Sequence, residues 1–252
     1  MTPTTVPLAD DLAAAARAWA QGLVAAAGPS FRALYVYGSA LGPGFDRDSS
    51  DVNLLVVLDS MPFARLEALA DGAAKLPPPG DGKFRFAPLV LTEGTLQGST
   101  DDFPIDFLDL KERRALIEGA DVLAGLEVPL VNLRHQCEYE LRSRFIGLRQ
   151  AWLRAAGARG AAHALVVRAA GASGSLFRHL LTLRGLAHPD EPQALARAVA
   201  EAYGIDAAGL DAPFAARSTQ PEPDEATARR RLAAYLEALE LLIRAVDAHP
   251  TR

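Results

Sequence analysis

The pattern of apolar residues changes near residue 130, and this change constrains the fold more than any other feature of the sequence. Before it, short apolar runs rich in β-branched and aromatic residues alternate with segments of helical periodicity. We expect strands at residues 31–37, 51–58, 84–92 and, as a short fourth strand, 105–108. We expect helices at residues 12–27 and 63–75. Strands that alternate with helices in this way favour an α/β layer arrangement.

Beyond residue 130 the sequence contains no convincing strand pattern. Helical segments are expected at residues 131–156, 161–186, 193–203 and 224–248. Pro189, Gly204 and the stretch 218–223 separate them, and four helices with modest connections fit an antiparallel bundle. The sequence therefore predicts an α/β domain at residues 1–125 and an all-α helical bundle domain at residues 126–252.

Composition excludes several classes of protein. The chain of 252 residues is 50% hydrophobic and 23% charged, which excludes a disordered chain. Its longest apolar-looking stretch, residues 12–28, is mostly alanine and contains Arg17, so it is too short and too polar to span a membrane. Asp10 and Asp11 precede it, whereas a secretory signal begins with a basic segment. With a single cysteine, Cys137, no internal disulfide is possible, and we expect a cytoplasmic protein without a membrane partner.

Charge is distributed unevenly along the chain. Residues 1–130 contain 10 Lys and Arg against 18 Asp and Glu, a net charge of -8. Residues 131–252 contain 16 against 13, a net charge of +3. An acidic first half argues against a nucleic-acid-binding face there, so we expect no nucleic-acid partner. It suits a site that gathers metal ions.

One segment carries residues that suit phosphate and metal chemistry. A predicted strand ends at Gly38, Ser39 follows, and after eleven intervening residues the next strand begins with Asp51-Val52-Asn53. Glycine lets a bulky anion approach the backbone, and Ser39 with nearby N–H groups is suited to hold a phosphate. Because side chains alternate along a strand, Asp51 and Asn53 fall on one face. Two oxygen-bearing side chains beside a phosphate-binding turn are what a Mg²⁺–nucleotide site requires.

This pattern resembles the signature of the polymerase-β-like nucleotidyltransferase superfamily, in which a Gly-Ser or Gly-Gly pair precedes Asp-x-Asp/Glu in a strand. An α/β head with a helical tail looks like the aminoglycoside nucleotidyltransferases. Residues 103–109 and 133–153 also look like segments of a bacterial subgroup of nucleotidyltransferase-domain proteins. The resemblance implies a nucleotidyltransferase-like α/β domain with a mixed sheet and flanking helices, followed by the helical bundle.

The resemblance also implies a site and its ligands. The substrate would be a nucleoside triphosphate (NTP), with Gly38 and Ser39 at its triphosphate. The cofactor would be Mg²⁺, held by Asp51 and Asn53. The reaction would transfer a nucleoside monophosphate to a small-molecule or protein acceptor.

The sequence departs from the superfamily pattern at two places. Asn53 replaces the second carboxylate of the motif, which keeps an oxygen ligand but removes one negative charge. A third carboxylate is usual on a later strand, and residues 84–92 contain no acid. We assign this third catalytic role to Asp106, provided that its strand lies beside residues 51–58; Glu93 and Asp109 are the other candidates.

Two functions therefore remain open at this stage. The first is Mg²⁺-dependent nucleotidyl transfer, with Asp51, Asn53 and Asp106 as the catalytic residues. The second is a catalytically inactive module that binds nucleotides or proteins on the same fold. Small members of the superfamily also act as the antitoxin-like half of two-component systems, which a chain with its own bundle fits less well.

Overall fold

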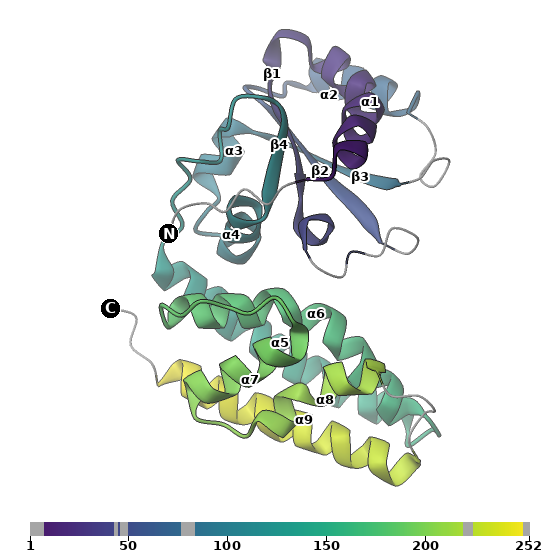
Figure 1. Ribbon diagram of the computed structural model, residues 1–252, viewed down its shortest axis with the longest axis vertical. Coiled ribbons are helices and arrows are strands. Elements are labelled where there is room, and N and C mark those ends of the chain that lie inside the picture. The colour runs from purple at the N-terminus through teal and green to yellow at the C-terminus, as the bar shows by residue number, and fades with distance from the viewer. Residues whose placement is uncertain (1–7, 43–44, 46–49, 77–83, 219–223, 249–252) are drawn as a thin grey trace. The chain divides into compact units, whose positions relative to one another are not determined.

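A computed structural model describes residues 8–42, 45, 50–76, 84–218 and 224–248 of the chain. The chain folds into two compact units, Met1–Val128 and Pro129–Arg252 (Figure 1). The division falls after Val128, whereas the sequence predicted it after residue 125. None of the described helices is long and apolar enough to cross a membrane.

The first unit is built around a four-stranded mixed sheet with the strand order β3-β2-β1-β4. Its elements in chain order are α1 (Asp10–Ala27), η1 (Gly28–Ser30), β1 (Phe31–Tyr37), η2 (Gly38–Leu41), β2 (Asp51–Leu58), α2 (Phe63–Ala73), β3 (Arg85–Thr92), α3 (Glu93–Gly98), α4 (Pro104–Glu112) and β4 (Arg114–Gly119). β1 is antiparallel to both β2 and β4, and β2 is parallel to β3. The strands predicted at residues 31–37 and 51–58 have the predicted bounds.

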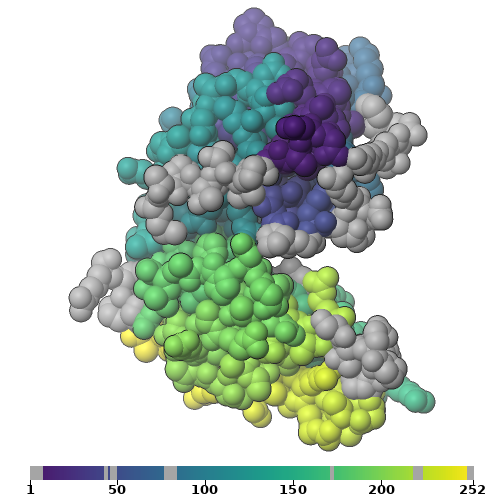
Figure 2. Space-filling view, in the orientation of Figure 1, coloured from purple at the N-terminus to yellow at the C-terminus, as the bar shows by residue number. Residues whose placement is uncertain are grey.

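Each face of the sheet is covered by a different pair of helices (Figure 1). On one face, Leu34, Val36, Leu54 and Val56 pack with residues of α1 and α2. On the other, Ala33, Tyr35, Leu55 and Val57 pack with residues of α3 and α4. Because successive side chains of a strand alternate between faces, both central strands are apolar throughout and buried on both sides. In the space-filling view α1, coloured dark purple, is exposed along its outer side (Figure 2).

The strand predicted at residues 105–108 is wrong, because this segment belongs to helix α4. Its buried residues Phe107 and Leu110 are three positions apart, which places them on one face of a helix. Pro104 lies at the start of α4, where its fixed φ suits the helix and its missing N–H has no intrahelical partner to lose. The fourth strand is instead β4, which pairs with β1.

The described part of the second unit contains five helices, one more than predicted. They are α5 (Leu130–Ala155), α6 (Ala161–Leu183), α7 (Pro192–Tyr203), α8 (Ala207–Ser218) and α9 (Glu225–Asp247). The prediction missed α8, which contains Gly209 and Pro213, two residue types that disfavour helix interiors. Tertiary packing overrides this preference: a Cβ at Gly209 would lie 2.6 Å from the Cβ of Ala238 in α9.

Candidate functional site

The turn that follows β1 brings the two parts of the Gly-Ser/Asp motif together. The chain leaves β1 at Tyr37 and turns through η2, where Gly38 has a φ of 79°, a conformation that glycine adopts readily. The Gly38 N–H donates to the carbonyl of Arg113 at 3.0 Å, which ties the turn to the residue that precedes β4. A Cβ at Gly38 would lie 3.3 Å from Nδ2 of Asn53. Ser39 follows on the exposed part of the turn.

The structure places Asp51 and Asn53 on the same face of β2. This face carries Leu55 and Val57 further along the strand, which pack in the core formed with α3 and α4. Asn53 is half-buried and pairs in register with Tyr37, at the end of β1. Asp51 is exposed and lies at the start of the strand. Gly38, Asn53 and Asp51 therefore follow one another along this end of the sheet.

An arginine that the sequence did not reveal lies beside Asp51. Arg85 begins β3 and pairs in parallel register with Asp51, so both side chains project from the same face. Nε of Arg85 is 3.1 Å from Oδ1 of Asp51, and the two side chains are 41% and 59% exposed. An ion pair this exposed contributes about 0–1 kcal/mol to stability. Its main consequence is electrostatic, because the guanidinium neutralises the carboxylate expected to bind a metal.

Asp106 approaches the site from a helix, since it lies in the first turn of α4. Burial raises the pKa of the Tyr37 hydroxyl, and the negative charge of Asp106 raises it further. Asp106 is therefore near enough for its charge to act on Tyr37, the residue that pairs with Asn53 in the sheet. The condition set for its role, a strand beside β2, is not met.

The alternative acids lie on α3 and α4. Glu93 begins α3, beyond the end of β3 that lies farthest from Arg85, roughly 25 Å along the strand from the site. It lies 4.0 Å from Arg32 in an exposed ion pair. Glu93 is therefore wrong as a third acid beside Asp51. Asp109 is half-buried one turn further along α4 than Asp106.

A buried arginine anchors the strand next to the site. Arg114, whose side chain is 6% exposed, forms a two-pronged contact with Asp121: Nε donates to Oδ1 at 3.0 Å and Nη2 to Oδ2 at 2.8 Å. Its Nη1 also donates to the carbonyl of Lys111. The hydroxyl of Tyr35 donates to Oδ1 of Asp121 at 3.1 Å. These bonds fix the start of β4. The preceding residue, Arg113, accepts the hydrogen bond from the Gly38 N–H, so the same bonds help to position the turn.

The same contacts shift the pKa values of the acidic partners. Burial, reinforced by the charge of Asp121, raises the pKa of Tyr35 to about 12. Burial on its own would raise the pKa of Asp121, but the hydrogen bonds and charge of Arg114 and the Tyr35 hydroxyl hold it below its usual value. No sequence pattern marked this cluster, because its residues come from separate elements.

The donor set at the site does not fit Mg²⁺. A magnesium ion in a protein is usually bound by one or two carboxylates together with substrate phosphates. Here the carboxylate of Asp51 is paired with Arg85, and the next position on the same face of the strand, Asn53, carries an amide. Within the part of the chain that the structure describes, no group of three or more His, Cys, Asp or Glu is arranged to hold a metal ion. These residues as they stand therefore do not support the Mg²⁺ ion that the sequence resemblance implied.

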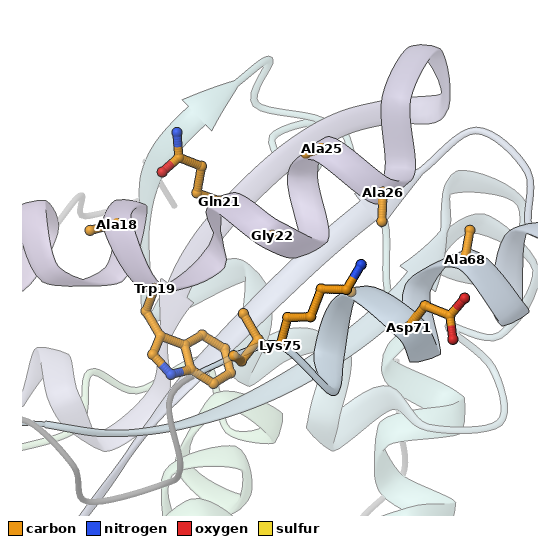
Figure 3. Close-up of a pocket in the computed structure, with 11 residues that line it drawn as sticks. Ala18, Trp19, Gln21, Gly22, Ala25, Ala26, Ala68, Asp71 and Lys75 are labelled. Carbon is orange, nitrogen blue, oxygen red and sulfur yellow. The ribbon is translucent and has the colours of Figure 1, made fainter.

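A groove of about 700 Å³ lies between α1 and α2, away from the motif. Figure 3 shows Trp19 and Gln21 projecting from α1, with Asp71 near the C-terminal end of α2 and Lys75 in the turn that follows it. Both helices cover the face of the sheet opposite to Asp51 and Asn53. The groove is therefore separate from the candidate site.

The mixed sheet with its Gly-Ser turn, followed by a helical unit, defines a nucleotidyltransferase-type fold of the aminoglycoside nucleotidyltransferase kind. A spectinomycin adenyltransferase from Enterococcus faecialis, solved with ATP and spectinomycin, matches the structure with a TM-score of 0.53 and 15% identity. The match covers 90% of this chain and 96% of that one. At this identity the likeness establishes the fold, and it confirms the predicted fold class.

A second solved structure aligns more loosely. A nucleotidyltransferase-like protein from Exiguobacterium sibiricum aligns with a TM-score of 0.38 and 16% identity, over 92% of this chain and 74% of that one. No protein-family model matches the sequence, and no match was found among proteins of curated function.

Proposed function

We propose that the α/β unit binds a nucleoside triphosphate, with the phosphates at the turn formed by Gly38 and Ser39. The observation that carries this proposal is the approach of Gly38 to Asn53, where a Cβ would lie 3.3 Å from Nδ2. The missing side chain leaves the backbone accessible to an anion beside an amide donor. An amide N–H can donate to a phosphate oxygen, whereas a carboxylate at position 53 would repel it.

The fold supports a nucleotide as the anion. The spectinomycin adenyltransferase of the same fold was solved with ATP, and it matches along nearly its whole length. Its nucleotide supports ATP or a related nucleoside triphosphate as the ligand here. Because that structure also contains spectinomycin, we include spectinomycin among the small-molecule acceptors to be tested.

The Asp51–Arg85 ion pair favours binding without chemistry over Mg²⁺-dependent transfer. Metal-assisted phosphoryl transfer relies on carboxylates that hold the cation at the transferring phosphate. At this site one carboxylate is occupied by an arginine and the second is replaced by an amide. We therefore conclude that the chain is a nucleotide-binding module on a nucleotidyltransferase fold.

Nucleotidyl transfer to a small-molecule or protein acceptor is the second candidate. The observation that favours it is the position of Asp106, whose charge acts on Tyr37 next to Asn53. An acid there is suited to take a proton from an acceptor hydroxyl. This function would require the Asp51–Arg85 pair to open.

Titration calorimetry with ATP and with GTP tests the binding proposal. We expect saturable heat for at least one nucleotide at or below millimolar concentration. The absence of heat from folded protein with both nucleotides would reject the proposal. A second assay separates the two functions by following pyrophosphate release from ATP with and without spectinomycin. Release above that of an Asp106→Asn variant would establish transfer, and binding without release supports the module.

A further inference from the structure

The pairing of Asp51 with Arg85 bears on how the site holds its ligand, and the inference rests on the proposed nucleoside triphosphate binding. We propose that the site binds the triphosphate without a divalent cation, and that Arg85 supplies the positive charge that a metal ion would supply. The ligand class is thus a metal-free nucleoside triphosphate.

The position of Arg85 in the sheet supports this role. Because Arg85 pairs in parallel register with Asp51, its side chain projects from the face that also carries Asn53. Its side chain is 41% exposed, so a ligand can reach it. The ion pair with Asp51 brings Nε to 3.1 Å from Oδ1 without forming a hydrogen bond, and the guanidinium carries five N–H donors in a rigid fork. Such a fork can contact a carboxylate and a phosphate at the same time, and it suits the planar recognition of phosphate.

A second arginine lies at the other end of the turn. A Cβ at Gly42 would lie 3.3 Å from Nη1 of Arg113, so this guanidinium packs against the end of η2. Arg85 pairs with Asp51, and Arg113 adds a second positive charge beside the turn. Two guanidinium groups near the turn attract an anion without a bound cation, in contrast to a cluster of unpaired carboxylates.

Asn53 fits the same arrangement. In a metal site, an amide in place of a carboxylate weakens binding because it removes a charge from the cation's ligands. In a metal-free site, the same amide removes a repulsion and adds a donor toward phosphate. Metal-free binding of the triphosphate therefore explains both the amide at position 53 and the presence of Arg85 beside Asp51.

The test measures the dissociation constant (Kd) for ATP, with GTP in parallel, in EDTA and in excess Mg²⁺. For the unmodified chain we expect the two Kd values to agree within about twofold. Arg85→Gln should weaken binding in EDTA by about tenfold or more, because a charge-assisted hydrogen bond is lost and Asp51 is left facing the phosphates.

Arg32→Gln is the matched control for Arg85→Gln. Arg32 forms an exposed ion pair with Asp59 at 2.7 Å, and its side chain is 38% exposed, close to the value for Arg85. It lies on β1 in the same sheet, at the end far from Gly38. We expect Arg32→Gln to leave the Kd for ATP unchanged in both buffers.

A further pair of variants tests the substitution of an arginine for a metal directly. In Arg85→Gln, Asp51 is released, so Mg²⁺ should recover part of the lost affinity. In the double variant Asp51→Asn/Arg85→Gln this recovery should disappear. The proposal is overturned if the unmodified chain binds ATP only with Mg²⁺, or if Arg85→Gln binds in EDTA as tightly as Arg32→Gln; in both cases nucleotide binding itself stands. Absence of binding in both buffers would instead reject the proposed function.

Discussion

Gly38 and Asn53 lie against one another where β1 ends and β2 begins, with little room for a side chain at position 38: a Cβ there would be 3.3 Å from Nδ2 of Asn53. Gly38→Ala should therefore displace the Asn53 amide and narrow the approach to the backbone. We expect the Kd for ATP to rise about tenfold or more. Because Gly38 has a φ of 79°, the variant should also lose roughly 1–2 kcal/mol of unfolding free energy. Calorimetry and urea unfolding measure the two effects.

Gly160→Ala separates the two effects of Gly38→Ala. Gly160 has a φ of 77°, nearly the same as Gly38, but a Cβ there meets nothing within 4 Å. It precedes α6 in the second unit, outside the sheet. We expect a similar loss of stability and no change in the Kd for ATP. Equal changes in affinity for both variants would mean that Gly38 acts through stability alone, and the assignment of Gly38 to the phosphates would fall.

Asn53→Asp should make nucleotide binding depend on Mg²⁺. The substitution places a second carboxylate on the face of β2 that carries Asp51, and the side chains are close in size. Without metal, ATP affinity should fall at least tenfold, because two unit charges about 4 Å apart near a surface interact by about 4 kcal/mol before screening by salt. Mg²⁺ should restore binding, and it should also stabilise the variant against unfolding. If Mg²⁺ changes neither the melting temperature of Asn53→Asp nor its Kd for ATP, this face of β2 does not bind a metal ion even with a second carboxylate.

The elements with strong local signals were predictable from the sequence. β1 and β2 are apolar on both faces because they are the two central strands, and their bounds were predicted correctly. The Gly-Ser turn and the shared face of Asp51 and Asn53 follow from strand periodicity alone. Segments whose structure depends on distant partners were predicted wrongly or missed. The segment at 105–108 is too short for its apolar spacing to distinguish a strand from the helix α4.

The electrostatics of the site depended on strand register, which no local pattern encodes. Arg85 is 34 positions from Asp51 in the chain and lies beside it only because β3 pairs in parallel with β2 in one register. A shift of the pairing by one residue would place Arg85 beside Val52, whose side chain is buried on the opposite face. The network of Arg114, Asp121 and Tyr35 depends in the same way on the pairing of β4 with β1.

Arg114→Met should destabilise the α/β unit much more than the matched Arg32→Met. The Arg114 side chain is 6% exposed, and its removal takes away the guanidinium bonds to Asp121 and to the Lys111 carbonyl, while the Tyr35 hydroxyl still donates to Asp121. We expect a loss of about 2–3 kcal/mol, less than for a fully buried pair because the side chain of Asp121 is 39% exposed and can regain water. Arg32→Met breaks an exposed pair and should cost less than about 1 kcal/mol. Equal losses in urea unfolding would contradict the anchoring role of Arg114.

The Arg114–Asp121 pair should also make stability depend on acid pH. The pKa of Asp121 is lower in the folded chain than its usual value of about 3.9, so the folded state binds this proton less readily than the unfolded state. Its contribution is fully present above about pH 4 and is lost as the pH falls through the lower, folded pKa. Asp121→Asn should be less stable at neutral pH and should show a flatter decline below pH 4. A decline as steep as that of the unmodified chain would assign the acid sensitivity to other carboxylates.

Two glycines in helices of the second unit should respond to alanine with opposite signs. Alanine favours a helix interior over glycine by about 1 kcal/mol, so both substitutions gain from propensity. At Gly209 in α8, however, a Cβ would lie 2.6 Å from the Cβ of Ala238 and 2.7 Å from the carbonyl oxygen of Ala234. Forcing α8 away from α9 should cost about 1–3 kcal/mol, which exceeds the gain, so Gly209→Ala should destabilise the chain. At Gly147 in α5 a Cβ meets nothing within 4 Å, and Gly147→Ala should stabilise the chain by about 0.5–1 kcal/mol. Urea unfolding followed by circular dichroism measures both, and a stabilising Gly209→Ala would contradict the close packing of α8 on α9.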